Sequence, residues 1–246
     1  MSAPCEPVAG ARHPGRVGWG LPDVVFCWLA GGFAAGLVGV SLSDRVAGEA
    51  GSLYLFGVIL PAQQLAVILA MVFISRVKGQ GSLAADFGLR IRLTDARAVL
   101  AGGVLEIALA FAVIPLLSLD GEAKPQQLLR DLEHSQNPVT VALFVIGAVI
   151  AAPVVEELLF RGMLLRALLR RFEPATAVLG SAVSFALVHY IGDPNTLLYL
   201  PALTALGVVL GVVVMRTNNL SRAIFIHAGF NLTTTVIFLV AGSGSS

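Results

Sequence analysis

The sequence predicts an all-α protein, a polytopic bundle of about seven transmembrane helices. Two properties of the composition lead to this fold class: 57% of the 246 residues are hydrophobic and only 13% are charged. Soluble domains carry about 25% charged residues, so this chain is depleted in the groups that solvate a folded surface. The third observation is that the apolar residues gather in runs long enough to cross a hydrocarbon core of about 30 Å.

Seven such runs, separated by short polar segments, define a single membrane domain. This domain is expected to span residues 23–241, between a polar N-terminal tail at 1–22 and a flexible tail at 242–246. The sequence has no internal repeat and no segment with the composition of a soluble domain. The predicted membrane helices cover residues 23–42, 52–75, 97–118, 139–163, 175–191, 198–215 and 221–241.

Basic residues alternate between the connecting segments, and this alternation predicts an orientation. Arg and Lys are in excess before the first helix and after the second, fourth and sixth helices, whereas the other loops are neutral or acidic. Because cytoplasmic loops are enriched in Arg and Lys, we expect a multi-pass protein of the cell membrane with a cytoplasmic N-terminus. A net charge of +1 argues against a nucleic-acid partner and leaves the lipid bilayer as the expected one.

Two adjacent glutamates in the fourth apolar run, Glu156 and Glu157, are its most informative polar residues. A charged side chain at the centre of a membrane helix costs about 2.5 to 3.5 kcal/mol, so both carboxylates need partners, water or a chemical task. Arg161 follows Glu157 by one turn, and we expect these two side chains to form an orienting pair. Glu156 points about 100° away and has no such local partner.

His189 in the fifth apolar run is expected to face Glu156. The intervening turn is predicted near Glu173, because Pro174 suits the first turn of a helix. The two residues lie about 16 positions before and after this turn, which is about 24 Å along each of two antiparallel helices. They therefore meet at the same depth. The segment 191–195 then lies close to them, so we expect a short fifth helix that ends at a water-filled chamber.

His227 and Asn231 in the last apolar run lie one turn apart and share a helix face. A carboxylate beside an imidazole suits the activation of water, and a second His with an Asn can donate hydrogen bonds to a developing oxyanion. The set Glu156, His189, His227 and Asn231 therefore predicts a hydrolytic centre within the bilayer. Glu156, His189 and His227 could equally hold a divalent metal such as Zn, and the chain lacks a His-Glu-x-x-His motif that would decide.

Other features receive simpler interpretations. Glu106 in the third run is either a proton-relay residue or a buried hydrogen-bonding partner. His13 and His134 are expected to be solvated. The spacing of Cys5 and Cys27 indicates neither a disulfide nor a redox motif. Two Gly-xxx-Gly pairs are expected to let helices pack closely, Gly32 with Gly36 and Gly207 with Gly211.

Three motifs, taken together, resemble those of a known family. Glu156-Glu157-x-x-x-Arg161, Phe185-x-x-x-His189 and His227-x-x-x-Asn231, in this order, resemble the CPBP family of intramembrane proteases. That family includes the type II CAAX prenyl proteases and bacterial Abi proteins linked to bacteriocin self-immunity. The resemblance covers residues 138–240, whereas the first half of the chain matches only as generic membrane helices.

The resemblance implies an all-helical membrane protease, of a kind often called a metalloprotease. By this likeness Glu156 activates water with help from His189, and His227 with Asn231 stabilises the oxyanion. Glu157, Arg161 and Phe185 would shape the site. The implied partner is a peptide or membrane-protein substrate, and no feature of the sequence selects prenylated substrates, a cleavage site or an oligomeric state.

The main hypothesis is an intramembrane endopeptidase that hydrolyses a peptide bond near the cytoplasmic membrane face with activated water. One alternative is a non-proteolytic membrane protein that confers immunity or assists assembly by binding. A second alternative is a proton-coupled transporter that uses Glu106, Glu156 and the histidines, although the chain lacks the repeats usual in transporters.

Overall fold

A computed structural model describes residues 18–45, 49–119, 127–133 and 137–242, and within these ranges the chain is helical without any strand. The predicted all-α class is therefore confirmed. Six helices are long and apolar enough to cross a membrane, and a seventh, α5 (Ala98–Leu119), coincides with the predicted third span. The six spans are Leu21–Ser41, Ala50–Lys78, Pro138–Leu168, Pro174–Gly192, Pro194–Thr217 and Ser221–Val240.

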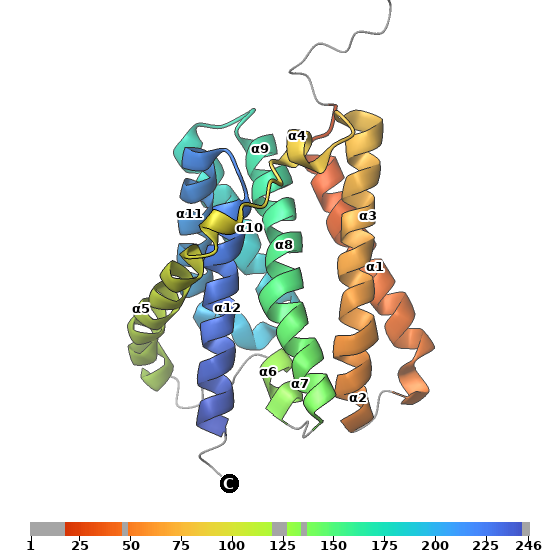
Figure 1. Ribbon diagram of the computed structural model, residues 1–246, viewed down its shortest axis with the longest axis vertical. Helices are drawn as coiled ribbons and strands as arrows, with labels where there is room; N and C mark the ends of the chain where they lie inside the picture. Colours follow the sequence, from red (N-terminus) through yellow and green to blue (C-terminus); the bar gives the residue numbers. More distant parts are fainter. Residues whose placement is uncertain (1–17, 46–48, 120–126, 134–136, 243–246) are drawn as a thin grey trace, which may run out of the picture.

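A continuous helix of 31 residues, Pro138–Leu168, stands in the middle of the bundle (Figure 1). It begins where the side chain of Asn137 accepts a hydrogen bond from Val139 N and Pro138 occupies the first turn. Two π-helical segments interrupt it, and such segments are frequent at functional sites. Its parts are α7 (Pro138–Val145), η4 (Ile146–Ala151), α8 (Ala152–Glu157), η5 (Leu158–Leu165) and α9 (Arg166–Leu168).

Three helix pairs pack around this central helix (Figure 1). Two of the pairs reach η5 through α1 and α10, and the third reaches η4 and α8 through α12. Side chains from α10 and α12 can therefore meet those of the central helix. The pairs are α1 (Leu21–Ser41) with α3 (Leu60–Lys78), α10 (Pro174–Gly192) with α11 (Leu200–Thr217), and α5 with α12 (Ser221–Gly242).

Short elements complete the bundle. A small apolar cluster of Phe56, Leu129, Leu132 and Phe144 lies at the end opposite α4, apart from the main core. The short elements are η1 (Ser43–Arg45), α2 (Glu49–Tyr54), η2 (Leu55–Ile59), α4 (Leu83–Phe87), η3 (Leu93–Asp95), α6 (Gln127–Glu133) and η6 (Pro194–Tyr199).

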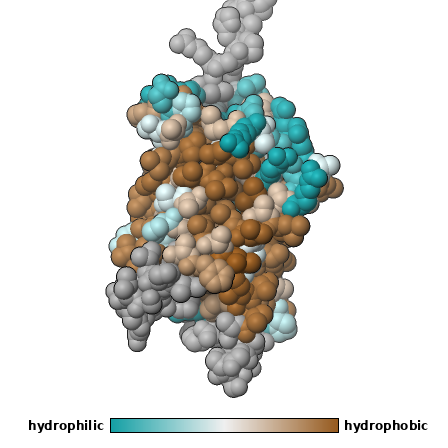
Figure 2. Space-filling view, turned by 90° about the vertical axis from the view of Figure 1, so that its left-hand side faces the viewer, coloured by the Kyte–Doolittle hydropathy of each residue, from teal (hydrophilic) through white to brown (hydrophobic). Residues whose placement is uncertain are grey.

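Basic residues gather at one end of the bundle, the upper end in Figures 1 and 2. Figure 2 shows hydrophilic residues mainly at this end and a broad hydrophobic surface below it. The chain crosses between the two ends in the alternating order that the loop charges predicted. Basic residues at this end include Arg76, Lys78, Arg166, Arg216 and Arg222.

Of the two predicted Gly-xxx-Gly contacts, one is present, and the prediction of the other is wrong. A Cβ atom at Gly207 would lie 2.8 Å from Ala182, and one at Gly211 would lie 3.1 Å from Val178, so this pair lets α11 pack tightly on α10. Gly32 and Gly36 instead have no heavy atom within 4 Å of such a position. The reason is rotation of α1, because the neighbouring Gly31 is the residue that meets α3.

One close helix crossing was not anticipated. Gly102 of α5 lies against the backbone of Ile226 and Phe230, and Gly229 of α12 lies against the backbone of Val99. Two glycines from different helices thus bring α5 and α12 into backbone contact. The pattern was hard to detect because neither glycine belongs to a Gly-xxx-Gly motif.

The described residues include packing contacts a few residues before the predicted start of the membrane domain. Trp19 is buried and packs edge-on against Phe87, while its carbonyl accepts a hydrogen bond from Arg170 at 2.6 Å. Lys78 and Asp23 form an ion pair of 2.6 Å beside it. Residues 1–17, with Cys5 and His13, and residues 134–136, with His134, lie outside the described ranges. Cys27 is buried and forms no disulfide with a described residue.

Candidate functional site

Glu156 and Glu157 lie at the end of α8, between the two π-helical segments of the central helix. Their side chains enter different environments. Glu157 is fully buried, whereas the side chain of Glu156 is 26% exposed. The two adjacent carboxylates therefore differ in access, as their predicted divergence on the helix implies.

His189 meets Glu156 as the helix lengths predicted. α10 begins at Pro174, and fifteen residues later His189 Nε2 lies 3.9 Å from Glu156 Oε2. The His189 side chain is 27% exposed, similar to that of Glu156. The proximity of these two residues is thus confirmed, and both side chains are partly exposed.

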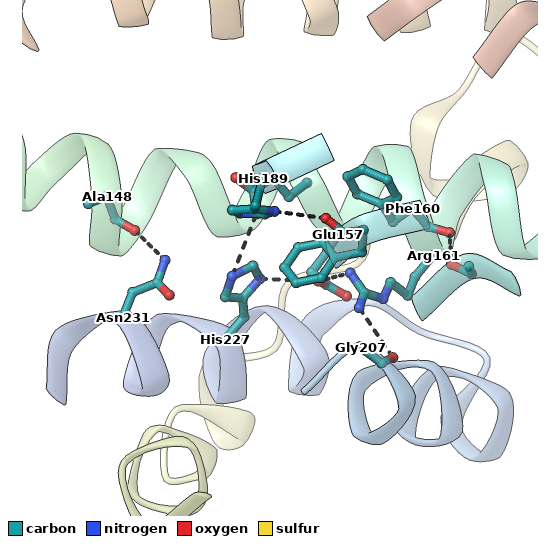
Figure 3. A network of polar contacts seen from close by, with 11 residues as sticks. Ala148, Glu157, Phe160, Arg161, His189, Gly207, His227 and Asn231 are labelled. Atoms are coloured by element: carbon teal, nitrogen blue, oxygen red, sulfur yellow. Dashed lines mark hydrogen bonds and ion pairs between the residues drawn. The ribbon is translucent and has the colours of Figure 1, made fainter. Parts of the chain in front are cut away.

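His227 joins the two glutamates. Its Nε2 lies 3.6 Å from Glu156 Oε2, and its Nδ1 lies 3.2 Å from Glu157 Oε1. Its side chain is only 2% exposed. Figure 3 shows the two imidazoles beside each other, with α12 and α10 supplying one each.

The hydrogen-bond partners fix which imidazole nitrogen carries a hydrogen. His189 Nδ1 lies 2.8 Å from the carbonyl oxygen of Phe185, which can only accept, so Nδ1 is the donor. His227 Nδ1 donates to the carboxylate of Glu157 for the same reason. In both neutral imidazoles, Nε2 is then an acceptor that faces Glu156.

Three hydrogen-bond acceptors, Glu156 Oε2 and the two Nε2 atoms, therefore converge without a donor between them. Glu156 Oε2 has no hydrogen-bond partner among the described residues, and the two Nε2 atoms lie beyond direct hydrogen-bonding distance. A buried carboxylate oxygen in this position needs a proton on one imidazole, or a bound water, to satisfy it. A water there would lie beside a carboxylate and an imidazole, which is the arrangement that general-base catalysis requires.

A buried ion pair holds Glu157 in place. Arg161 Nη1 donates to Glu157 Oε1 at 2.8 Å, and Nη2 donates to the carbonyl of Gly207 in α11 at 3.2 Å. Both side chains of the pair are completely buried. The Arg161–Glu157–His227 chain thus links α11, the central helix and α12, and orients the imidazole of His227.

Phe185 forms the apolar wall of this centre. Its ring is fully buried and lies 4.6 Å from that of His189 and 5.5 Å from that of His227, measured between centroids. The guanidinium of Arg161 lies 4.6 Å from the same ring centroid, a cation–π distance. Phe185 therefore touches both imidazoles and the supporting arginine.

Asn231 does not join the imidazoles and Glu156. Its Nδ2 donates to the carbonyl oxygen of Ala148 in η4 at 2.8 Å, and Figure 3 shows it pointing there, to one side of His227. The sequence predicted a donor for an oxyanion, but the described partner of this amide is a backbone carbonyl. The sequence did not point to Ala148 as a partner.

Glu106 lies in a separate polar contact. Its Oε1 accepts a hydrogen bond of 2.8 Å from Thr234 Oγ1, which ties α5 to α12 two turns beyond His227. This contact fits the predicted role of a buried hydrogen-bonding partner. A role in proton relay stays a prediction.

The fifth membrane helix is short, as expected. α10 has 19 residues, about 28 Å, and ends three residues after His189. The irregular backbone that follows is satisfied locally, because Asp193 Oδ1 accepts from Asn195 N at 3.0 Å and Thr196 donates to the Asp193 carbonyl at 2.7 Å. The water-filled chamber stays a prediction.

The sequence left open a metal held by Glu156, His189 and His227. Within the described ranges, no group of three or more His, Cys, Asp or Glu side chains is arranged to hold a metal ion. A metal held by these three side chains stays a prediction.

The fold and this centre define a class: a polytopic helical membrane protein whose polar side chains converge on an unpartnered glutamate inside the bundle. Residues 138–233 match the family described as "Type II CAAX prenyl endopeptidase Rce1-like". All three sequence motifs lie in this segment, so the match confirms the resemblance for this part of the chain. No curated protein and no solved structure matches the chain significantly.

Proposed function

We propose that this protein is an intramembrane endopeptidase in which Glu156 and His189 activate water. The family that residues 138–233 match is one of endopeptidases, and the observation that carries the proposal is the unpartnered Glu156 Oε2 between two imidazole Nε2 atoms. The pair Glu156–His189 is partly exposed, whereas the supporting pair Glu157–Arg161 is not. This is the distribution expected of reacting groups and the groups that orient them.

The proposed reaction is a single displacement by water. Glu156 takes a proton from the water, which His189 orients, while the water oxygen bonds to the carbonyl carbon of the peptide. The resulting oxyanion is stabilised by the doubly protonated form of His227, which carries a solvent-derived proton on Nε2 and so donates from Nδ1 to Glu157 and from Nε2 to the oxyanion. The C–N bond then breaks as the proton passes from Glu156 to the leaving amine, which gives a carboxylic acid and an amine.

The position of the centre supports cleavage on the cytoplasmic side. His227 lies six residues, about 9 Å, after the start of α12 at the basic end, and fifteen residues, about 22 Å, before its other end. Glu156 lies 12 residues from Leu168 and 18 from Pro138, again nearer the basic end. If that end is cytoplasmic, as its charges predict, a peptide reaches the centre from the cytoplasmic face, and the N-terminus is cytoplasmic.

Comparison of membranes that contain the wild type or Glu156→Gln tests the proposal. Mass spectrometry of peptide termini is expected to find new C-termini in membrane proteins with the wild type and none of these with the variant. Glu106→Gln is the matched control, because it also removes a membrane carboxylate but leaves the centre intact. Identical termini in all three samples, at equal protein abundance, would favour a binding or immunity role without proteolysis.

A further inference from the structure

Pro153 leaves one carbonyl of the central helix without a backbone partner. At the end of η4 the backbone follows an i to i−5 pattern, in which Ala152 N donates to the carbonyl of Gly147. In this register the next carbonyl, that of Ala148, would accept from residue 153. Proline has no N–H, so that bond cannot form. Within a bilayer an unsatisfied carbonyl is costly, and a neighbouring group must supply the donor.

Asn231 supplies that donor. Its Nδ2 lies 2.8 Å from Ala148 O, although the two residues are 83 positions apart in the chain. The bond joins α12 to the central helix close to the reacting groups: Asn231 follows His227 by one turn, and Pro153 precedes Glu156 by three residues. Displacement of this bond would therefore move His227 relative to Glu156, whose polar atoms lie 3.6 Å apart.

We propose that Asn231 is a positioning residue, required because Pro153 has removed the backbone donor for Ala148. Through this bond it fixes the place of His227 against Glu156. The inference rests on the proposed function for its effect on catalysis, but the bond itself does not depend on that function. It assigns to Asn231 a role other than the oxyanion contact that the sequence predicted.

A double-mutant cycle between Asn231→Leu and Pro153→Ala tests the proposal, since Pro153→Ala restores an N–H that can satisfy the carbonyl. With Pro153 present, Asn231→Leu is expected to lower kcat about tenfold or more and to change KM less than about twofold. In the Pro153→Ala background the same substitution should lower kcat less than about threefold. The substrate is a membrane-protein fragment identified from the new C-termini described above.

The unfolding midpoint in detergent is a second readout that needs no activity. Asn231→Leu should lower it clearly with Pro153 present and much less with Ala at that position. Thr235→Val is the control, because Thr235 donates to the backbone carbonyl of Asn231 at 2.8 Å, whereas Ala148 is bonded by the side-chain amide of Asn231. Its effects on kcat and on the midpoint should be the same in both backgrounds.

The outcomes separate the two proposals. An equal loss of kcat from Asn231→Leu in both backgrounds would overturn the positioning role and indicate direct contact with the reacting atoms. Equal shifts of the midpoint in both backgrounds would overturn the coupling to Pro153 itself. If no variant and no wild type cleaves any fragment while the midpoints are coupled, the proposed function fails but the hydrogen-bond relationship stands.

Discussion

Arg161 offers the sharpest test of how the site is held, because its replacement exposes the consequence of burying Glu157. Arg161→Met keeps most of the side-chain volume and removes the charge. Both partners of the present ion pair are fully buried, at 2.8 Å. Removal of one partner of such a pair costs about 3 to 5 kcal/mol, because the other charge stays buried and unpaired. The cost of losing the hydrogen bond to the Gly207 carbonyl is included in this range, so we expect Arg161→Met to lower the unfolding free energy by about 4 kcal/mol.

The double variant Glu157→Leu/Arg161→Met separates stability from catalysis. With both charges gone, the unfolding free energy should recover by at least about 2 kcal/mol relative to Arg161→Met, because an apolar pair is often tolerated in place of a buried ion pair. Cleavage should not recover, since His227 Nδ1 has lost its acceptor. Denaturant titration in micelles, followed by circular dichroism, gives the stabilities. A loss below about 1 kcal/mol for Arg161→Met, or full activity of the double variant, would refute this reasoning.

Two further predictions concern packing and metal. Gly102→Ala and Gly229→Ala should each lower the unfolding free energy by about 1 to 3 kcal/mol, because each added methyl group meets backbone. Gly32→Ala, which adds a methyl group in open space, should change it by less than about 0.5 kcal/mol. Equal effects of the three substitutions in the same titration would contradict the α5–α12 crossing. If Glu156 and His189 activate water unaided, as proposed, dialysis against a chelator should leave cleavage within about twofold. A loss of cleavage that added Zn restores would instead show that a metal assembles the site.

Much of the fold could be predicted from the sequence because membrane helices obey simple length and charge rules. The proximity of Glu156 and His189 followed from counting residues on either side of one turn. The count was reliable because Pro174 marks the start of α10. The role of Glu157 as the buried partner of Arg161 followed from their spacing of one turn. These are local regularities, so one sequence sufficed to predict them.

Contacts that depend on backbone register or helix rotation could not be predicted in this way. The sequence placed Asn231 on the correct face of its helix, but its partner is a carbonyl that is free only because η4 is π-helical. Gly32 and Gly36 have the spacing of a packing motif, yet the rotation of α1 turns Gly31 toward α3 instead. Pro153 was a partial signal for the first of these, since a proline within a membrane helix removes one backbone donor, but which carbonyl loses it depends on the helical register.

Cleavage in a single turnover in ¹⁸O-labelled water, by purified wild type and Glu156→Gln, tests the central claim most directly. The account predicts that the wild type places one solvent oxygen in the new carboxyl group. It also predicts that Glu156→Gln cleaves at least about a hundredfold more slowly, with an unchanged unfolding midpoint. Cleavage by Glu156→Gln at the wild-type rate, or a first-turnover product without label, would contradict activation of water by Glu156.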